Sequence, residues 1–463
     1  MTTIASTTSA QGTLAAATTS APGAALRPER PTGLEEAVRI EAGQRRFDFD
    51  VAIVGLGYVG LPTALAFHAA GARVLGVDVS ARRLEEIFSY RADLVESDRA
   101  RLDEALEDEH FLLTQDTSVI QAAAAVIVCV PTPIDAHQVP DLKILRGACA
   151  MVVDTAVAGQ LLMLTSTTYA GCTRDLLVEP LAARGLEAGT DVFVAFSPER
   201  IDPGNTRFAQ EDVPRVIGGA TRACAAKAHA LISRYAHRTH TVASMEAAEM
   251  TKLLENTFRA VNIAMINEFA EACRDLDVSV TEVIDAAATK PYGFMAFYPG
   301  PGVGGHCIPC DPHYLLWQLR KRHRGAPVIE QAMTAISQRP GRTADRVREV
   351  LSGAGAGIRD ARVLVLGVSY KPDVADLRES PALEIITELR AMGADVGYHD
   401  PHFAAIDFGG ERLAHVEDPA GFGADLVLLH TRHSAVDLDW IDPRAIVLDA
   451  TYRATDVPGS IAL

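Results

Sequence analysis

The distribution of apolar residues divides the chain into three regions of different pattern. From about residue 48 to 243, short apolar runs alternate with helical stretches and predict buried strands at 51–54, 73–78, 125–130, 161–166, 192–196 and 213–217. Between 244 and about 339 the strand signal stops, and residues 245–276 predict one long helix. Short apolar runs and helical stretches alternate again after residues 352–357. Strands are predicted there at 362–366, 395–399, 425–430 and 445–449.

This order of elements predicts an α/β fold in which two Rossmann-like domains are joined by a long central helical region. The expected boundaries are a disordered tail at 1–46, a nucleotide-binding domain at 47–243, a helical dimerisation and active-site region at 244–340, and a smaller α/β domain at 341–463. The tail is rich in Ala, Thr and Ser and poor in large apolar residues, so burial could not offset the entropy of ordering it.

Composition narrows the class of protein. A net charge of −17 argues against nucleic acid or an anionic membrane surface as a partner. Seven scattered cysteines, an odd number in a chain without a secretory signature, suggest reduced thiols in the cytoplasm. No apolar run reaches the roughly 18 residues needed to span a bilayer. We therefore expect a soluble cytoplasmic protein.

A glycine-rich turn follows the first predicted strand. Residues 55–60 read Gly-Leu-Gly-Tyr-Val-Gly and open a helix, whose N-terminus supplies N–H donors to a pyrophosphate. Asp78 is the last residue of the second predicted strand, about 20 residues after this turn. An acid at this position accepts hydrogen bonds from a ribose 2′-OH. This arrangement predicts NAD, although Arg82 and Arg83 leave a 2′-phosphate of NADP as an alternative.

Residues 297–311 combine four glycines and three prolines around Cys307. Glycine lets a ligand approach the backbone and proline stiffens it, so we interpret this segment as a loop that wraps a substrate and presents a thiolate. Lys252 or His306 would favour the thiolate, although His306 also fits a structural loop histidine. Cys307 and Cys310 form a C-x-x-C pair, which leaves a zinc site or a redox pair as alternatives.

Five motifs occur in one order, and together they resemble the UDP-glucose/GDP-mannose dehydrogenase family over essentially everything after residue 47. They are Gly-Leu-Gly-Tyr-Val-Gly-Leu-Pro at 55–62, Ser-Pro-Glu-Arg-Ile at 197–201, Lys-x-x-Glu-Asn at 252–256, Gly-Gly-His-Cys at 304–307, and Tyr-Lys-Pro-x-x-x-Asp-x-Arg-x-Ser-Pro at 370–381. The resemblance implies that the C6 alcohol of a nucleotide sugar is oxidised twice, with two NAD⁺, to a carboxylate.

The resemblance also implies roles for the matched residues. A thiolate can hold an aldehyde as a thiohemiacetal that is then oxidised to a thioester, so Cys307 is the expected nucleophile. Lys252 and Asn256 share one helix face and are expected to stabilise an oxyanion at C6. Glu199 resembles the family glutamate that activates water to hydrolyse the thioester, and Asp311 the aspartate that accepts a proton together with the lysine and a bound water.

Further site residues are expected from the same resemblance. Thr167 lies in a turn that resembles the family Ser-Thr-Val turn and would hold that water, although the Pro-Gly that follows in the family is Ala170-Gly171 here. The expected cofactor-binding residues are Gly55, Gly57, Tyr58, Val59, Gly60, Asp78, Arg83, Thr132, Thr167 and Arg378. The expected substrate-binding residues are Glu199, Arg200, Lys252, Asn256, Arg259, Lys290, Phe297, Tyr298, Gly302, Gly304 and Lys371. No metal ligand is expected.

The expected partners are a UDP-sugar and a second copy of the chain. Resemblance favours UDP-N-acetylglucosamine, then UDP-N-acetylmannosamine, then UDP-glucose. The helix at 245–276 is the expected dimer element, with Lys290 reaching a neighbouring subunit. Two rival functions are a single-step hydroxyacid dehydrogenase, which would not need Cys307, and a non-catalytic nucleotide-sugar binder. We also hypothesise that Cys310 forms a disulfide with Cys307 under mild oxidation, which unchanged activity in oxidant would refute.

Overall fold

The computed structural model describes residues 38–41, 44–200, 209–305, 307–442 and 444–463. Its larger sheet has eight strands in the order β10–β9–β8–β7–β6–β3–β4–β5. These strands are β3 (Val51–Val54), β4 (Val74–Val77), β5 (Phe111–Thr114), β6 (Ala125–Val128), β7 (Leu161–Leu164), β8 (Phe193–Phe196), β9 (Arg215–Gly219) and β10 (Thr239–Val242). The six predicted strands are confirmed. The sequence pattern missed β5 and β10, which are partly exposed edge strands.

The order of β5, β4, β3, β6, β7 and β8 is that of a dinucleotide-binding sheet, and it reverses direction between β3 and β6. Neighbouring strands are parallel except for β8 and β9, which pair antiparallel. This pair departs from the parallel pairing of a Rossmann-like sheet. A parallel pair needs a long crossover, usually a helix, and the described part of the β8–β9 connection contains only the short turn Gln210–Asp212.

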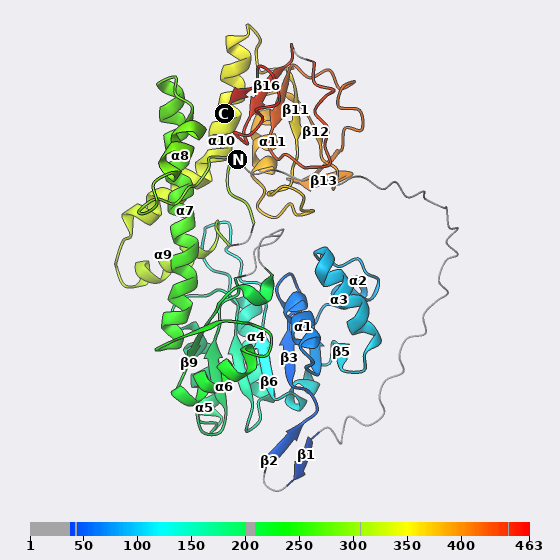
Figure 1. Ribbon diagram of the computed structural model, residues 1–463, viewed down its shortest axis with the longest axis vertical. Coiled ribbons are helices and arrows are strands. Elements are labelled where there is room, and N and C mark those ends of the chain that lie inside the picture. The colour runs from blue at the N-terminus through cyan, green and yellow to red at the C-terminus, as the bar shows by residue number, and fades with distance from the viewer. Residues whose placement is uncertain (1–37, 42–43, 201–208, 306, 443) are drawn as a thin grey trace, which may run out of the picture. The chain divides into compact units, whose positions relative to one another are not determined.

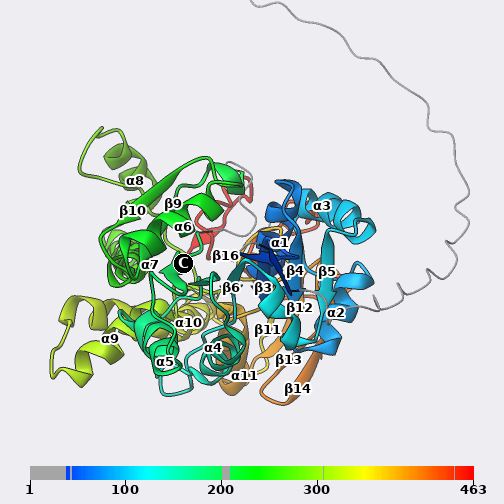
Figure 2. The ribbon, with the colours of Figure 1, turned by 90° about the horizontal axis from the view of Figure 1, so that it is seen from below.

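Apolar helix faces cover both sides of this sheet, and Figure 2 shows α1 and α4 on opposite sides. The core on one side joins the strands to α1 (Gly60–Ala69), α2 (Ala81–Phe88), α3 (Glu96–Glu107) and α6 (Arg222–Ile232). The core on the other side joins them to α4 (Lys143–Thr155), the turn Arg174–Val178, α5 (Glu179–Ala183) and the start of α7. A further turn, Thr117–Ala122, contributes to that second core.

The second sheet has five parallel strands in the order β12–β11–β15–β16–β17. They are β11 (Arg362–Leu366), β12 (Asp395–His399), β15 (Leu426–Leu429), β16 (Ile446–Asp449) and β17 (Ile461–Ala462), with α11 (Pro381–Ala391) packed on β12. The four predicted strands are confirmed. The short β17 and the antiparallel pair β13 (Ala405–Phe408) and β14 (Glu411–Ala414) were not predicted. The strand order reverses between β11 and β15, where such folds bind ligands.

Four helices, drawn in green and yellow in Figure 1, link the two sheets in sequence: α7 (Met245–Asp275), α8 (Val280–Ala288), α9 (Asp311–Lys321) and α10 (Pro327–Gly353). The predicted long helix is confirmed as α7. It starts where the Ser244 hydroxyl accepts a hydrogen bond from the Ala247 N–H at 3.1 Å. Both α9 and α10 pack on α7, so the residues of three helices meet beside the larger sheet.

Part of the predicted disordered tail is ordered. β1 (Val38–Glu41) and β2 (Gln44–Phe47) form an antiparallel hairpin, with Val38 opposite Phe47. Apolar and polar residues alternate over Val38–Glu41, a pattern that suits a strand and that the composition argument overlooked. Residues 1–37 lie outside the described residues. None of the helices in the described ranges is long and apolar enough to cross a membrane.

Candidate active site

The glycine-rich turn between β3 and α1 has the shape that a dinucleotide requires. Gly55 has a φ of +90°, which only glycine adopts without strain. A Cβ on Gly60 would lie 1.7 Å from the Gly55 carbonyl oxygen, so this helix start packs directly on the turn. A Cβ on Gly57 would meet nothing within 4 Å. Open space at the second glycine is what the approach of a pyrophosphate needs.

Asp78 lies at the end of β4 beside this turn. Its Oδ2 accepts a hydrogen bond from the Leu56 N–H at 2.8 Å, and its Oδ1 accepts one from the Ser80 N–H at 2.9 Å. Arg83 donates through Nε to the Leu56 carbonyl oxygen at 2.8 Å, and Arg82 pairs with Glu86 at 2.9 Å. These arginines are engaged within the protein and Asp78 faces the turn, so the residues fit NAD and disfavour the extra phosphate of NADP.

We predict that Gly57→Ala weakens NAD binding by about tenfold or more and leaves the melting temperature unchanged. The added methyl meets no protein atom, but it enters the space that the pyrophosphate needs, and a crowded contact costs about 1–3 kcal/mol. Calorimetric titration with NAD measures the affinity. Gly147→Ala on α4, whose new Cβ also meets nothing within 4 Å, is the matched control and should bind NAD normally. Equal affinities of the two variants would contradict this prediction.

Other predicted cofactor residues join the two α/β regions. The Arg378 guanidinium lies 4.8 Å from the centre of the Tyr58 ring and pairs with Asp376 through two nitrogens. Burial is the main cause that raises the pKa of Tyr58. Val59 is the residue immediately before α1. The Thr132 carbonyl oxygen accepts a hydrogen bond from the hydroxyl of Tyr314, on α9, at 3.1 Å.

The predicted catalytic residues meet where α7 passes the start of α9. Lys252 donates through Nζ to the Glu199 backbone carbonyl at 2.8 Å. One helical turn on, Asn256 donates through Nδ2 to Asp311 Oδ2. The Asp311 N–H donates to the Cys307 carbonyl at 2.8 Å, so the thiol-bearing loop turns directly into α9. Segments far apart in sequence thus bring an amine, an amide and a carboxylate together, next to the backbone of the residue that carries the thiol.

Asp311 is the most strongly perturbed carboxyl of this group. Its side chain is fully enclosed, and burial raises its pKa to about 6, although Lys252 and Asn256 oppose the shift. A carboxyl with a pKa near 6 can accept a proton at neutral pH and give it back. The arrangement therefore suits Asp311 as a general base with a nearby ammonium group.

Glu199 is held by a residue that the sequence analysis missed. Arg215, at the start of β9, pairs through Nη1 with Glu199 Oε1, which also accepts the Arg200 N–H at 2.7 Å. In the structure Ala195 lies opposite Gly219 and Phe196 opposite Gly218, so the same antiparallel register brings Arg215 toward Glu199. The sequence carries no signal for this pairing, because it does not give the direction of β9.

Arg200, a predicted substrate residue, is built into the scaffold here. Its Nη1 donates to the Pro214 carbonyl at 2.7 Å, and its Nη2 pairs with Glu255 on α7. Glu255 therefore contacts the end of β8 and not the group around Asp311 in the described residues. The pair ties the end of β8 to the helix that carries Lys252.

The glycines of the thiol loop pack against another loop, at residues 370–381. A Cβ on Gly304 would lie 2.4 Å from Tyr370 Cβ, and one on Gly302 would lie 2.6 Å from Pro381 Cγ. Gly305 has a φ of +79°, and its N–H donates to the Arg378 carbonyl at 2.9 Å. Gly302 and Gly304 thus permit close contact between two protein segments, and their expected contact with the substrate stays a prediction.

The two cysteines of this loop have different surroundings. Cys307 is exposed, whereas Cys310 is buried and burial raises the pKa of its thiol to about 12. None of the seven cysteines is in a disulfide. Within the described ranges no cluster of three or more His, Cys, Asp or Glu residues is suited to a metal ion. His306 lies outside the described residues, and the redox hypothesis for Cys310 stays a prediction.

The remaining predicted residues are more dispersed. Phe297 packs against Phe258 of α7 with ring centres 5.9 Å apart, and the Tyr298 hydroxyl donates to Asp285 of α8 at 2.7 Å. In the described part of the chain, no contact joins Arg259, Lys290 or Tyr298 to the group around Asp311. Thr167 is half-buried and follows β7, while Lys371 is half-buried and follows β11 at the reversal point of the second sheet.

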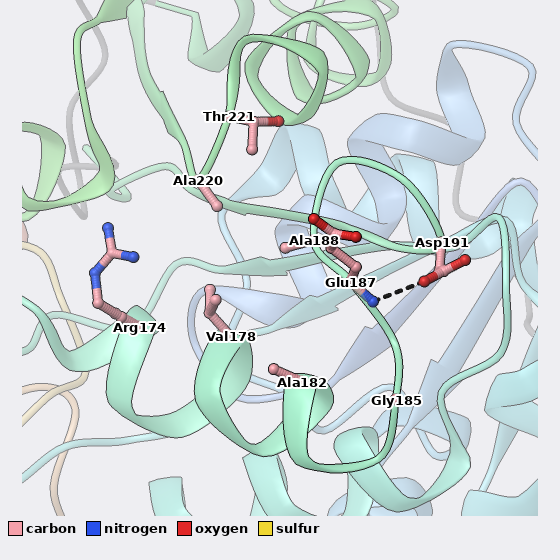
Figure 3. Close-up of a pocket in the computed structure, with 9 residues that line it drawn as sticks. All are labelled: Arg174, Val178, Ala182, Gly185, Glu187, Ala188, Asp191, Ala220 and Thr221. Atoms are coloured by element: carbon pink, nitrogen blue, oxygen red, sulfur yellow. Dashed lines mark hydrogen bonds between the residues drawn. The ribbon is translucent and has the colours of Figure 1, made fainter.

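A surface pocket of about 460 Å³ lies elsewhere. Figure 3 shows its lining, which comes from the Arg174–Val178 turn, α5, the loop before β8 and the segment after β9. Because β9 is antiparallel to β8, both of these loops lie at the amino end of β8. Glu199 follows the carboxyl end of the same strand, so this pocket is separate from the catalytic group.

Comparison with known proteins agrees with this geometry. Three models of the UDP-glucose/GDP-mannose dehydrogenase family match: the NAD binding domain at residues 49–236, the central domain at 246–336 and the UDP binding domain at 364–455.

The relatives extend over most of the chain. A UDP-N-acetyl-D-mannosamine dehydrogenase of Pyrococcus horikoshii is 35% identical over 83% of this chain and 89% of its own length. A UDP-N-acetyl-D-glucosamine 6-dehydrogenase of Pseudomonas aeruginosa is 33% identical over 84% and 91%. The solved structure of the UDP-D-ManNAc dehydrogenase from P. horikoshii superposes with a TM-score of 0.81 at 32% identity, covering 89% of this chain and 98% of its own. The chain is therefore a member of the UDP-glucose/GDP-mannose dehydrogenase family, NAD-dependent nucleotide-sugar dehydrogenases that act on a CH–OH group.

Proposed function

We propose that this protein oxidises the C6 primary alcohol of a UDP-N-acetylhexosamine to a carboxylate in two successive steps at one site. The observation that carries the proposal is the connected group of Lys252, Asn256, Asp311 and the Cys307 loop where α7 meets α9. A single-step dehydrogenase has no use for the thiol, and a binding protein has no use for a buried base beside an ammonium group.

The first oxidation needs a base and a charge to stabilise the alkoxide. Asp311 takes the hydroxyl proton through a bound water, and the Lys252 ammonium and the Asn256 amide face the developing negative charge. NAD, when bound by the turn at 55–60 and Asp78, supplies the hydride acceptor for each oxidation. The product of this step is an aldehyde.

The second oxidation needs the aldehyde to be held covalently. The Cys307 thiolate adds to the aldehyde carbon, and the resulting thiohemiacetal loses a second hydride to become a thioester. Glu199 then takes a proton from the water that attacks the thioester carbon, and the carbon–sulfur bond breaks to release the carboxylate and the thiolate. The short backbone link between Cys307 and Asp311 supports a shared site for both oxidations.

For the sugar we propose UDP-N-acetylglucosamine first and UDP-N-acetylmannosamine second. Relatives that carry each of these names match the chain over more than four fifths of its length. The experiment is a comparison of kcat/KM for UDP-N-acetylglucosamine, UDP-N-acetylmannosamine and UDP-glucose, with mass spectrometry of the product. A uronic acid formed fastest from UDP-glucose would contradict an N-acetylhexosamine substrate.

We also propose that the protein is a homodimer through α7. Five large apolar side chains at helical spacing are more than a third exposed along this helix: Met250, Leu254, Phe258, Met265 and Phe269. A continuous exposed apolar stripe on a helix suits a protein–protein contact. Sedimentation velocity measures the mass in solution, and a monomer at micromolar concentration would contradict this assignment.

A further inference from the structure

Arg215 is a buried cation placed against a residue of the proposed active site. Its side chain is 3% exposed, and that of Glu199 is 12% exposed. Because β8 and β9 run antiparallel, the start of β9 lies beside the carboxyl end of β8, and the Arg215 guanidinium reaches Glu199 Oε1. Arg215 is thus held on a strand of the sheet, and Glu199 lies three residues beyond the end of β8.

The surroundings of Arg215 keep its guanidinium charged. Burial lowers the pKa of Arg215, but the Glu199 carboxylate and the neighbouring Tyr235 more than offset this, and the net shift is upward. The guanidinium lies 5.4 Å from the centre of the buried Tyr235 ring. Its Nε and Nη2 are buried, and neither has a hydrogen-bond partner among the described residues. Among the described residues, Glu199 is therefore the one carboxylate that pairs with this buried cation.

We propose that Arg215 is a positioning residue for the hydrolytic step, in which it fixes the orientation of the Glu199 carboxylate toward the attacking water. This inference rests on the proposed function, because it assumes that a thioester forms on Cys307. A carboxylate that accepts a proton from water has to point at that water, and a charge-assisted hydrogen bond to one of its oxygens restricts its rotation.

Arg215 should affect the rate of thioester hydrolysis alone. Loss of Arg215 should leave both oxidations intact and slow only the attack of water on the thioester carbon. The acyl group then stays on Cys307 until the carbon–sulfur bond breaks, so the covalent adduct accumulates. A pair that served only to hold β8 and β9 together would lower stability without trapping an adduct.

The experiment compares wild type, Arg215→Met and Arg215→Lys, mixed with NAD and the UDP-sugar that wild type oxidises. Intact-protein mass spectrometry after rapid quenching measures the fraction of enzyme carrying the acyl group. Arg215→Met should slow turnover about 10²–10³-fold and carry the adduct on most active sites, by analogy with the loss of one general-base or charge-stabilising contact. Arg215→Lys, which keeps the charge but not the planar donor geometry, should show an intermediate adduct fraction.

Arg101→Met is the matched control, since it removes another arginine that pairs with a glutamate, Glu211, in the same α/β region. It should show no adduct. If Arg215→Met does not fold, the adduct fraction of Arg215→Lys decides the question.

Two results distinguish failure of the positioning role of Arg215 from failure of the proposed function. If wild type releases two NADH per sugar and neither Arg215 variant carries an adduct above the wild-type level, the positioning role is overturned and the proposed function stands. If wild type releases one NADH per sugar and no variant forms an adduct, the proposed function itself fails.

Discussion

Cys307→Ser is expected to lower steady-state turnover by about a thousand-fold or more, with NAD affinity unchanged. A serine hydroxyl is ionised far less than a thiol at neutral pH, so the aldehyde is no longer captured as a covalent intermediate. Cys307 is the exposed thiol of its loop and lies four residues before Asp311. NADH absorbance with saturating NAD and sugar gives the rate, and calorimetry gives the NAD affinity.

Cys310→Ser is the control for this substitution. Cys310 is three residues away in the same loop, but it is buried and the proposed chemistry does not use it. Its variant should retain turnover within a few-fold of wild type, as expected for a mild core substitution. A Cys307→Ser enzyme that kept turnover within tenfold of wild type would refute the role of the thiol.

Asp311→Asn is expected to lower turnover by about 10²–10⁴-fold, the usual effect of removing a general base. Wild-type kcat/KM should fall below a pH of about 6 with the slope of one proton, because the base must be deprotonated and burial raises the pKa of Asp311 to about 6. The variant should lack this acidic limb. A pH–rate series on both proteins measures the effect, and an unchanged acidic limb in the variant would assign the titration to another group.

The same substitution should not reduce thermal stability at neutral pH. The pKa of Asp311 is higher in the folded protein than its ordinary value of 3.8, so the folded state binds the proton more tightly. Asp311 thus contributes to the free energy of unfolding at low pH. This contribution is lost as the pH rises from about 4 through about 6. Asparagine removes the buried charge, so its melting temperature at pH 7.5 should equal or exceed that of wild type.

Residues whose place in the fold is set by their immediate neighbours in the chain could be predicted from the sequence. The strand–turn–helix pattern located Gly55, Gly57 and Gly60. The turn itself requires Gly55 and Gly60, and the approach of a pyrophosphate needs the open space at Gly57. Lys252 and Asn256 were placed on one face of α7 by their spacing, since a continuous helix fixes the relation of residues four apart.

Residues that act through long-range pairing could not be predicted in the same way. Arg215 reaches Glu199 because β9 reverses direction, and apolar runs give no strand direction. The glycines of the thiol loop were recognised as unusual, but their neighbours Tyr370 and Pro381 come from a segment more than sixty residues later. The hairpin of β1 and β2 was missed because composition was averaged over the whole tail.

The central claim is that one site oxidises the same carbon twice through Cys307. The most direct test is the number of NADH molecules formed per UDP-sugar when the sugar is limiting and NAD is in excess, measured for wild type and Cys307→Ser. We predict two NADH per sugar for wild type and a loss of this turnover in the variant. One NADH per sugar, formed equally well without the thiol, would contradict it.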